Sequence, residues 1–384
     1  MKKVRILSID GGGIKGILPA TILRYVENQL REKQGDDVRL CDYIDLFAGT
    51  STGGILSLLY NIPNDNNRPA YTSQQALDVY RENGDDIFEV SLFRRLSSVA
   101  GLIDEKYSSE PLNRLLDEYC GDYMLAELIR PCMITAYDFR NRNAKFFTSY
   151  DANNKVSNFF IRDVARATSA APTYFEPVRI YSELGTPYSL IDGGVFANNP
   201  ALCAYSEARK MDFCRILGDE DKPDYPTAKD MMIFSISTGT ETKKYKYREM
   251  RDRGLINWVK PIIDILMSGN SETVHYQLKQ IWSTLDPEDQ QDYYRLNPSL
   301  NNCEERAPST CCLRIPITTT SLLTVLSPRP RSLPLRPWPT TRIALPFSSK
   351  FAILMPPTTC GAILPSPFPL WMFRSKPMGS NWSW

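Results

Sequence analysis

Residues 43–60, YIDLFAGTSTGGILSLLY, decide the fold class of this 384-residue chain. Tyr43–Ala48 is apolar enough for a buried strand, and the segment after Gly53 stays apolar through Tyr60, as in a buried helix. The glycines between the two segments permit a sharp turn from strand to helix. A short buried strand that turns directly into a helix is typical of α/β proteins with a parallel sheet.

Strand-like and helix-like segments alternate in this way through about residue 302. Their apolar spacing predicts further strands and helices. The predicted strands are Val4–Ile9, Pro131–Tyr137, Lys145–Ser149 and Met231–Ser237, and the predicted helices are Ile17–Arg31, Phe160–Ser169, Asn199–Lys210 and Leu255–Gln280, the last with a break near Gly269. We therefore expect an α/β fold in which helices cover both faces of a mainly parallel sheet.

The composition changes abruptly after residue 302. Residues 303–384 contain 14 of the 28 prolines and only two acidic residues, Glu304 and Glu305. Prolines this frequent are incompatible with helices and central strands. The composition favours either a disordered Pro/Ser/Thr/Arg-rich tail or a segment translated out of frame, because a frame change also removes acidic residues suddenly. We therefore expect one folded domain over residues 1–302, followed by a tail over 303–384.

The overall composition excludes several classes of protein. With 45 Lys and Arg against 44 Asp and Glu, the net charge of +1 provides no basic surface for nucleic acid. A single histidine, His275, excludes a His-rich metal site, and the nine scattered cysteines form no CxxC pair. No stretch approaches the roughly 18 apolar residues of a membrane helix, and the apolar run Ile6–Ile9 is too short for a signal peptide. We therefore expect a cytoplasmic protein with free thiols and no metal.

Ser51 is the candidate nucleophile. It is the central residue of Gly49–Gly53 (GTSTG), which matches G-x-S-x-G and lies between a predicted strand and a predicted helix, as that motif requires. Gly49 and Gly53 permit a turn that raises the serine hydroxyl above the sheet. The amino terminus of the following helix also favours negative charge beside the serine.

Asp192 is the candidate base for this serine. His275 is a weaker candidate, because its predicted place inside a helix is typical of a solvated or core histidine. Asp192 ends an apolar segment and precedes Gly193 and Gly194. An ordinary aspartate, with a pKa near ~3.9, is a weak base, so burial and a hydrogen bond to Ser51 are needed to raise its basicity. The alternative is an Asx-type turn in which this carboxylate is structural.

Asp10–Gly16 (DGGGIKG) is the third glycine-rich motif, again between a predicted strand and a predicted helix. Gly11–Gly16 matches G-x-G-x-x-G, so a dinucleotide site is one interpretation. An oxyanion hole is a second, because consecutive glycines let backbone N–H groups converge on a negative charge. A structural turn is the third, and the motif alone does not decide among them.

Together the three motifs resemble the patatin-like phospholipase family, over about residues 4–300. Asp10–Gly16 is similar to the glycine-rich oxyanion motif of that family, Gly49–Gly53 to its nucleophile elbow, and Asp192–Gly194 to its D-G-[AG] motif. Ala167–Phe175 and Asp192–Pro200 resemble further signatures of the family. The resemblance implies a three-layer α/β/α sandwich that hydrolyses acyl esters of membrane phospholipids, with neither metal nor cofactor.

The resemblance also implies a role for each motif. Ser51 would be the nucleophile, Asp192 the general base, and the N–H groups of Gly11, Gly12 and Gly13 the oxyanion hole. Lys15 stands where many relatives have arginine, which keeps the charge and loses the bidentate geometry. The supporting residues of the three motifs are Asp10, Lys15, Gly16, Gly49, Gly53, Gly193 and Gly194.

A membrane phospholipid substrate implies transient contact with a membrane surface. Lys243–Arg248 combines basic and aromatic residues and is either a solvated loop or a contact for anionic headgroups. Arg5–Asp10 and the motif spacing look most like bacterial members of the family, some of which are antiviral effectors, so a cyclic-nucleotide activator is a further hypothesis. The alternative functions are an acyltransferase that uses the same dyad and a nucleotide-binding protein that uses Gly11–Gly16.

Overall fold

The computed structural model describes residues 2–88, 108–240, 245–251 and 254–300. Beyond residue 300 it describes two short strands, β9 (Cys311–Leu313) and β10 (Ile343–Leu345), which pair with each other in antiparallel fashion. The rest of the predicted tail, and the first two lysines of the basic cluster that begins at Lys243, lie outside the described residues.

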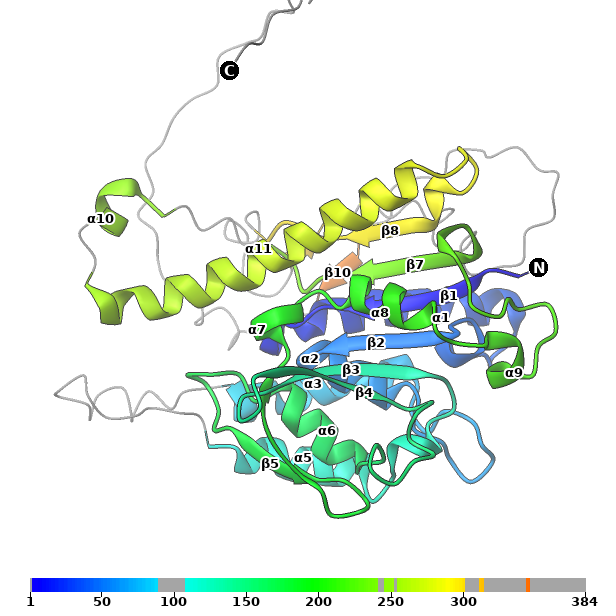
Figure 1. Cartoon of the computed structure of the whole chain (residues 1–384), viewed down its shortest axis with the longest axis horizontal. Helices are drawn as coiled ribbons and strands as arrows, with labels where there is room; N and C mark the ends of the chain where they lie inside the picture. Colours follow the sequence, from blue (N-terminus) through cyan, green and yellow to red (C-terminus); the bar gives the residue numbers. More distant parts are fainter. Residues whose placement is uncertain are drawn as a thin grey trace, which may run out of the picture.

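The main sheet and its helices occupy residues 4–296 (Figure 1). The strands of the sheet are β1 (Val4–Ile9), β2 (Leu46–Thr50), β3 (Cys132–Asp138), β4 (Asn143–Thr148), β5 (Val178–Tyr181), β6 (Pro187–Asp192), β7 (Met231–Ile236) and β8 (Tyr293–Leu296). The α-helices are α1 (Ile17–Gln34), α2 (Thr52–Leu59), α3 (Ser73–Phe88), α5 (Glu110–Cys120), α6 (Ile161–Thr168), α7 (Gly194–Ala197), α8 (Ala201–Ala208), α9 (Phe213–Leu217), α10 (Tyr247–Arg251) and α11 (Leu255–Ser283).

The strands form one mixed sheet in the order β5-β6-β3-β2-β1-β7-β8, and β4 pairs with β3 beside this path. The five strands from β3 to β8 in this order pair in parallel. Strands β4 and β6 are antiparallel to β3, and β5 is antiparallel to β6. The sheet is therefore mainly parallel, as the sequence predicts.

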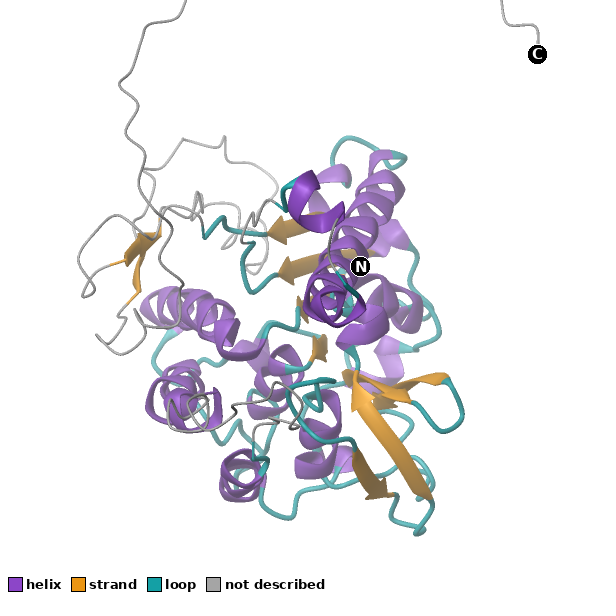
Figure 2. Ribbon diagram, turned by 90° about the vertical axis from the view of Figure 1, so that its left-hand side faces the viewer, coloured by secondary structure: helices purple, strands orange, loops and turns teal. Residues whose placement is uncertain are grey.

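Helices cover both faces of the sheet, which gives the molecule three layers (Figure 2). Alternate side chains of a strand point to opposite faces. On β1, Leu7 and Ile9 belong to a core shared with α1, α2, α3, α5 and α6, whereas Val4 and Ile6 belong to a core shared with α8, α9 and α11. This arrangement confirms the expected α/β/α sandwich.

Helix α11 differs from the prediction, because it continues through Gly269 without a break. A glycine inside a helix costs only about 1 kcal/mol relative to alanine, so tertiary contacts can outweigh it. The next two residues provide such contacts: Asn270 donates to the Phe196 carbonyl (2.6 Å), and Ser271 accepts from Asn198 (3.1 Å). No helix in the described ranges, α11 included, combines the length and the apolar character needed to cross a membrane.

Candidate active site

Ser51 occupies a strained turn at the carboxyl end of β2. Strand β2 ends at Thr50 and α2 begins at Thr52, so Ser51 alone connects them. Its φ of 53° and ψ of −125° are unusual for a residue with a side chain, and such backbone strain is often found at functional sites. The Ser51 N–H donates to Thr168 Oγ1 on α6 (2.8 Å), which helps to hold this conformation.

The glycines on either side of Ser51 are required by close backbone contacts. A Cβ on Gly53 would lie 2.2 Å from the carbonyl oxygen of Ile9 at the end of β1. A Cβ on Gly49 would lie 2.3 Å from the carbonyl oxygen of Gly53. Because these neighbours are backbone atoms, they cannot move aside as a flexible side chain would. The G-x-S-x-G spacing therefore lets the first turn of α2 cross directly over the ends of β1 and β2.

The register of the sheet places Asp192 beside Ser51. In the parallel pair β2–β3, Thr50 lies opposite Thr135, so the next position, Ser51, is level with Ala136. In the antiparallel pair β3–β6, Ala136 lies opposite Asp192. Strand β3 therefore brings together two residues that are 141 positions apart in the sequence.

Burial and two hydrogen bonds determine the ionisation of Asp192. The side chain is 4% exposed, and burial raises its pKa from 3.8 to about 6. Hydrogen bonds from the Ser51 hydroxyl and from the Gly194 N–H, which lies 2.6 Å from Oδ1, partly oppose this increase. At neutral pH the group is mostly a carboxylate, but a more basic one than an ordinary aspartate.

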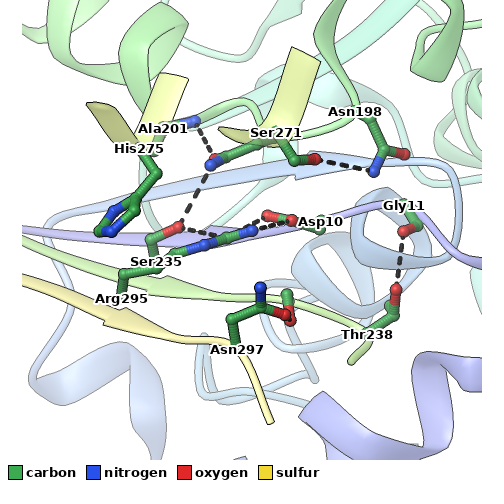
Figure 3. Close-up of polar contacts among 12 residues, drawn as sticks. Asp10, Gly11, Asn198, Ala201, Ser235, Thr238, Ser271, His275, Arg295 and Asn297 are labelled. Carbon is green, nitrogen blue, oxygen red and sulfur yellow. Dashed lines mark hydrogen bonds and ion pairs between the residues drawn. The ribbon is translucent and has the colours of Figure 1, made fainter. Parts of the chain in front are cut away.

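The glycine loop that follows β1 lies against Ser51. A Cβ on Gly11 would lie 3.3 Å from Ser51 Cβ, and a Cβ on Gly12 would lie 2.1 Å from Thr238 Oγ1. The Gly11 N–H donates to the Asn198 carbonyl (3.0 Å), and Thr238 Oγ1 donates to the Gly11 carbonyl (2.9 Å; Figure 3). The Gly11 amide is thus already occupied by Asn198.

Gly12 and Gly13 differ from Gly11 in this respect. Within the described part of the chain, neither of their N–H groups donates a hydrogen bond to a protein acceptor. Gly13 has a φ of 56°, the left-handed region that glycine adopts readily. Lys15 follows in the 3₁₀ turn Gly13–Gly16, and a Cβ on Gly16 would lie 2.1 Å from Thr52 Oγ1, so this turn packs directly against the start of α2.

Gly193 and Gly194 bring the Asp192 turn close to the sheet and to α11. A Cβ on Gly193 would lie 2.1 Å from Thr135 Oγ1 and 2.6 Å from the Thr135 carbonyl oxygen. A Cβ on Gly194 would lie 3.0 Å from Asp192 Oδ1 and 3.4 Å from the end of the Met267 side chain. Both glycines therefore serve close packing around the carboxylate.

Asp10 forms a buried ion pair with Arg295 that was not predicted from the sequence. Arg295 comes from β8, and its two terminal nitrogens lie 2.7 and 2.5 Å from the two carboxylate oxygens of Asp10 (Figure 3). The exposed fractions of the two side chains are 6% and 2%. The only signal in the sequence is an arginine within the short segment Tyr293–Leu296 (YYRL).

His275 contacts Tyr293, not the dyad. Its Nδ1 lies 3.0 Å from the Tyr293 hydroxyl, and burial lowers the pKa of the imidazole. Figure 3 shows His275 and Gly11 on opposite sides of the Asp10–Arg295 ion pair. Among the described residues, no group of three or more His, Cys, Asp or Glu side chains could hold a metal ion.

Comparison with known proteins identifies the family. Residues 7–205 match the family model described as patatin-like phospholipase. The chain belongs to the patatin-like phospholipase family. Patatin-like protein 2 of Oryza sativa subsp. indica is 35% identical over 317 residues, or 77% of this chain and 76% of the relative. Patatin-like protein 2 of Arabidopsis thaliana is 34% identical over 306 residues, or 74% of each chain.

This membership in the patatin-like family confirms the resemblance and indicates lipid acyl hydrolysis in general terms. A third relative, from Solanum tuberosum, is named "Probable inactive patatin-3-Kuras 1" and is 33% identical over 307 residues, or 76% of this chain and 78% of the relative. The family model spans Ser51, Asp192 and the three glycines, whereas Thr238 and Arg295 lie beyond the matched residues.

Proposed function

We propose that this protein is a serine lipid acyl hydrolase of the phospholipase A or lysophospholipase type, with Ser51 as nucleophile and Asp192 as general base. The observation that carries the proposal is the pair itself. A strained serine at the carboxyl end of β2 is hydrogen-bonded to a buried carboxylate whose pKa is about 6. Because a relative is named as inactive, the proposal depends on this geometry and not on family membership alone.

In the first half of the reaction, Ser51 Oγ attacks the carbonyl carbon of a fatty acyl ester while Asp192 accepts the hydroxyl proton. A general base works best when its pKa is close to the operating pH, so the raised pKa of Asp192 suits this step. The tetrahedral intermediate then expels the alcohol, which takes the proton from Asp192. The fatty acid remains on Ser51 as an ester.

In the second half, water attacks this ester and Asp192 again accepts a proton. Collapse of the second tetrahedral intermediate breaks the bond to Ser51 Oγ, which takes back the proton, and releases the fatty acid. If a second alcohol replaced water, the same intermediate would yield an acyltransferase. The two activities are distinguished by the product that is formed when an acceptor alcohol is present.

Backbone N–H groups of the glycine loop stabilise the oxyanion in both halves. The Gly12 and Gly13 amides are the best candidates, because the Gly11 amide donates to Asn198 in the structure. Gly11 can contribute only if this hydrogen bond opens when substrate binds. Donors that are oriented in advance toward a developing charge commonly contribute ~10²- to 10³-fold to the rate.

We further propose a cytoplasmic protein that contacts the membrane transiently to reach its phospholipid substrate. The relatives reported above are plant proteins whose names mention neither antiviral defence nor a nucleotide. Activation by a cyclic nucleotide is therefore a separate hypothesis. A panel of cyclic dinucleotides that left the lipase activity of the purified protein unchanged would reject it.

The dyad is tested by labelling with a fluorophosphonate, in which the serine oxygen displaces fluoride from phosphorus. We expect intact mass to show one adduct on the wild type, none on Ser51→Ala, and greatly slowed labelling of Asp192→Asn. Ser57→Ala is the matched control, because Ser57 is a buried serine of α2, the helix that follows Ser51, and it donates to the Gly53 carbonyl (2.8 Å). Undiminished labelling of Ser51→Ala would refute the proposed function.

A further inference from the structure

The position of the glycine loop depends on the residue that precedes it. Glycines have no side chains with which to fix their own backbone. Asp10 is held through its N–H, which donates to the Ile236 carbonyl on β7 (2.9 Å), and through its carboxylate, which contacts Arg295. The orientation of the Gly12 and Gly13 amides therefore depends on where Asp10 is held, together with the hydrogen bonds of Gly11 to Asn198 and Thr238.

Arg295 fixes both the charge and the orientation of the Asp10 carboxylate. Its two terminal nitrogens each contact one carboxylate oxygen, and this bidentate geometry defines the plane of the carboxylate. One of the nitrogens also donates to Ser235 Oγ on β7 (2.8 Å), which holds the guanidinium between two strands. Burial raises the pKa of Asp10, and the charge of Arg295 opposes that effect.

The ion pair belongs to the active-site end of the sheet. Asp10 immediately follows β1, and a Cβ on the next residue, Gly11, would lie 3.3 Å from Ser51 Cβ. Arg295 lies opposite Ser235 in the parallel pair β7–β8, and Ser235 in turn lies opposite Ser8 near the end of β1. Three neighbouring strands, β1, β7 and β8, thus position the Asp10–Arg295 ion pair at the carboxyl end of the parallel strands, where the dyad also lies.

We propose that Arg295 is a positioning residue for the oxyanion hole, acting through Asp10 on the Gly12 and Gly13 amides. The inference rests on the proposed function, since it assumes that these amides stabilise the intermediate on Ser51. It assigns to β8 a part in the reaction, although β8 lies outside the residues 7–205 that match the family model. Arg295 itself contacts Asp10 and Ser235, so its proposed effect on the substrate is indirect and passes through Asp10.

The chain offers a matched control at the other end of the same sheet. Lys222 forms a buried ion pair with Asp45, which immediately precedes β2, and the exposed fractions of the two side chains are 2% and 8%. Lys222 also donates to the Lys3 carbonyl just before β1 (2.8 Å). Loss of this cation removes the nearest positive charge from a buried carboxylate, as loss of Arg295 does, but far from the glycine loop. Asp45 then keeps the Arg5 side chain, whose Nε lies 3.6 Å from Oδ2.

The experiment measures the rate at which a fluorophosphonate labels Ser51 in Arg295→Met, Arg295→Lys and Lys222→Met, well below the melting temperature of each variant. For Arg295→Met we expect labelling and kcat to fall about 100-fold while KM for a soluble ester changes little, because displacing donors by about 1 Å costs that much. Arg295→Lys should remain about 10-fold slow, since an ammonium cannot hold both oxygens as a guanidinium does. Lys222→Met should melt earlier and label at the wild-type rate.

Two results would overturn the inference: wild-type labelling rates in the folded Arg295 variants, or an equal slowing in Lys222→Met. If Arg295→Met does not fold, the rate of Arg295→Lys decides, because that variant keeps a cation beside Asp10. Failure of the folded wild type to label is a different outcome, since it would reject the proposed function itself and the inference with it.

Discussion

The two ends of the main sheet each hold a buried ion pair, yet they differ in what surrounds it. At the amino end, Asp45 Oδ2 accepts from the Arg5 N–H (2.7 Å) and contacts Lys222, so this oxygen is well supplied with donors. At the carboxyl end, the Asp10–Arg295 pair precedes Gly11, whose Cβ would lie 3.3 Å from that of the strained Ser51 and 2.6 Å from Asn198 Oδ1. This Asn198 oxygen is buried without a partner among the described residues.

This difference separates a structural ion pair from the surroundings of the proposed active site within one fold. The Asp45 carboxylate is neutralised by a buried cation and has a structural role at the start of β2. Strained backbone, unpaired buried atoms and a carboxylate with a raised pKa all cost folding free energy, and they cluster where chemistry takes place. In the part of the chain that the structure describes, the carboxyl end combines all three around Ser51 and Asp192.

The largest expected effect comes from Ser51→Gly, which removes the proposed nucleophile together with the backbone strain. Ester hydrolysis should fall by at least about 10³-fold, as when a serine nucleophile is removed from other hydrolases. Because glycine tolerates a φ of 53°, this variant should be more stable than Ser51→Ala by about 1 kcal/mol. Denaturant unfolding of both variants measures the difference. Equal stabilities would mean that the turn stores no strain.

The next prediction compares two glycines inside helices: Gly53 in α2, beside Ser51, and Gly269 in α11. Gly53→Ala should destabilise the protein by about 3 kcal/mol or more and slow labelling of Ser51, because its Cβ would lie 2.2 Å from a backbone oxygen. Gly269→Ala should stabilise α11 by about 1 kcal/mol, since a Cβ there meets nothing within 4 Å. Thermal unfolding of both variants tests this contrast. A Gly53→Ala variant with the melting temperature of the wild type would contradict it.

The pH dependence of Asp192 should move activity and stability in opposite directions. Activity should rise with pH through about 6, because the base must be ionised. The folded-state pKa lies above the unfolded one, so the folded state binds the proton more tightly. The contribution of protonated Asp192 to the free energy of unfolding is fully present below about pH 4 and is lost as pH rises through about 6. The shift in pKa corresponds to about 3 kcal/mol of stability.

Asp192→Asn isolates this contribution, since asparagine does not titrate. Between pH 4 and pH 7, the wild type should lose up to about 3 kcal/mol of unfolding free energy relative to this variant. Urea unfolding at several pH values measures it. A gap that stayed constant with pH would show that Asp192 is not held in a buried, proton-favouring environment.

The parts of the site that could be predicted are those encoded locally. Gly49, Gly53 and Ser51 are adjacent in the sequence, and their spacing is dictated by one turn of backbone. Asp192 was predictable because its glycines mark a turn after an apolar segment. The expectation that burial raises its basicity agrees with a pKa of about 6. The expectation that the hydrogen bond to Ser51 adds to this increase was wrong, because that bond stabilises the carboxylate and lowers the pKa.

The parts that could not be predicted depend on the register between distant strands. Thr238 reaches Gly11 because β7 pairs with β1, and Arg295 reaches Asp10 because β8 pairs with β7. No spacing in the sequence encodes that order of strands. The predicted break at Gly269 was wrong for a related reason, since the contacts of Asn270 and Ser271 with residues near Asp192 are also long-range.

The smallest expected effect is that of His275→Ala. The imidazole is partly exposed and contacts the Tyr293 hydroxyl, so its loss should cost about 1 kcal/mol of stability and leave the labelling rate of Ser51 within about two-fold of wild type. Tyr293→Phe removes the same hydrogen bond from the other side and should cost a similar amount. The two substitutions together should cost less than the sum, because both delete one interaction. A His275→Ala variant that folds normally and fails to label, while Tyr293→Phe labels normally, would transfer the role of base from Asp192 to His275.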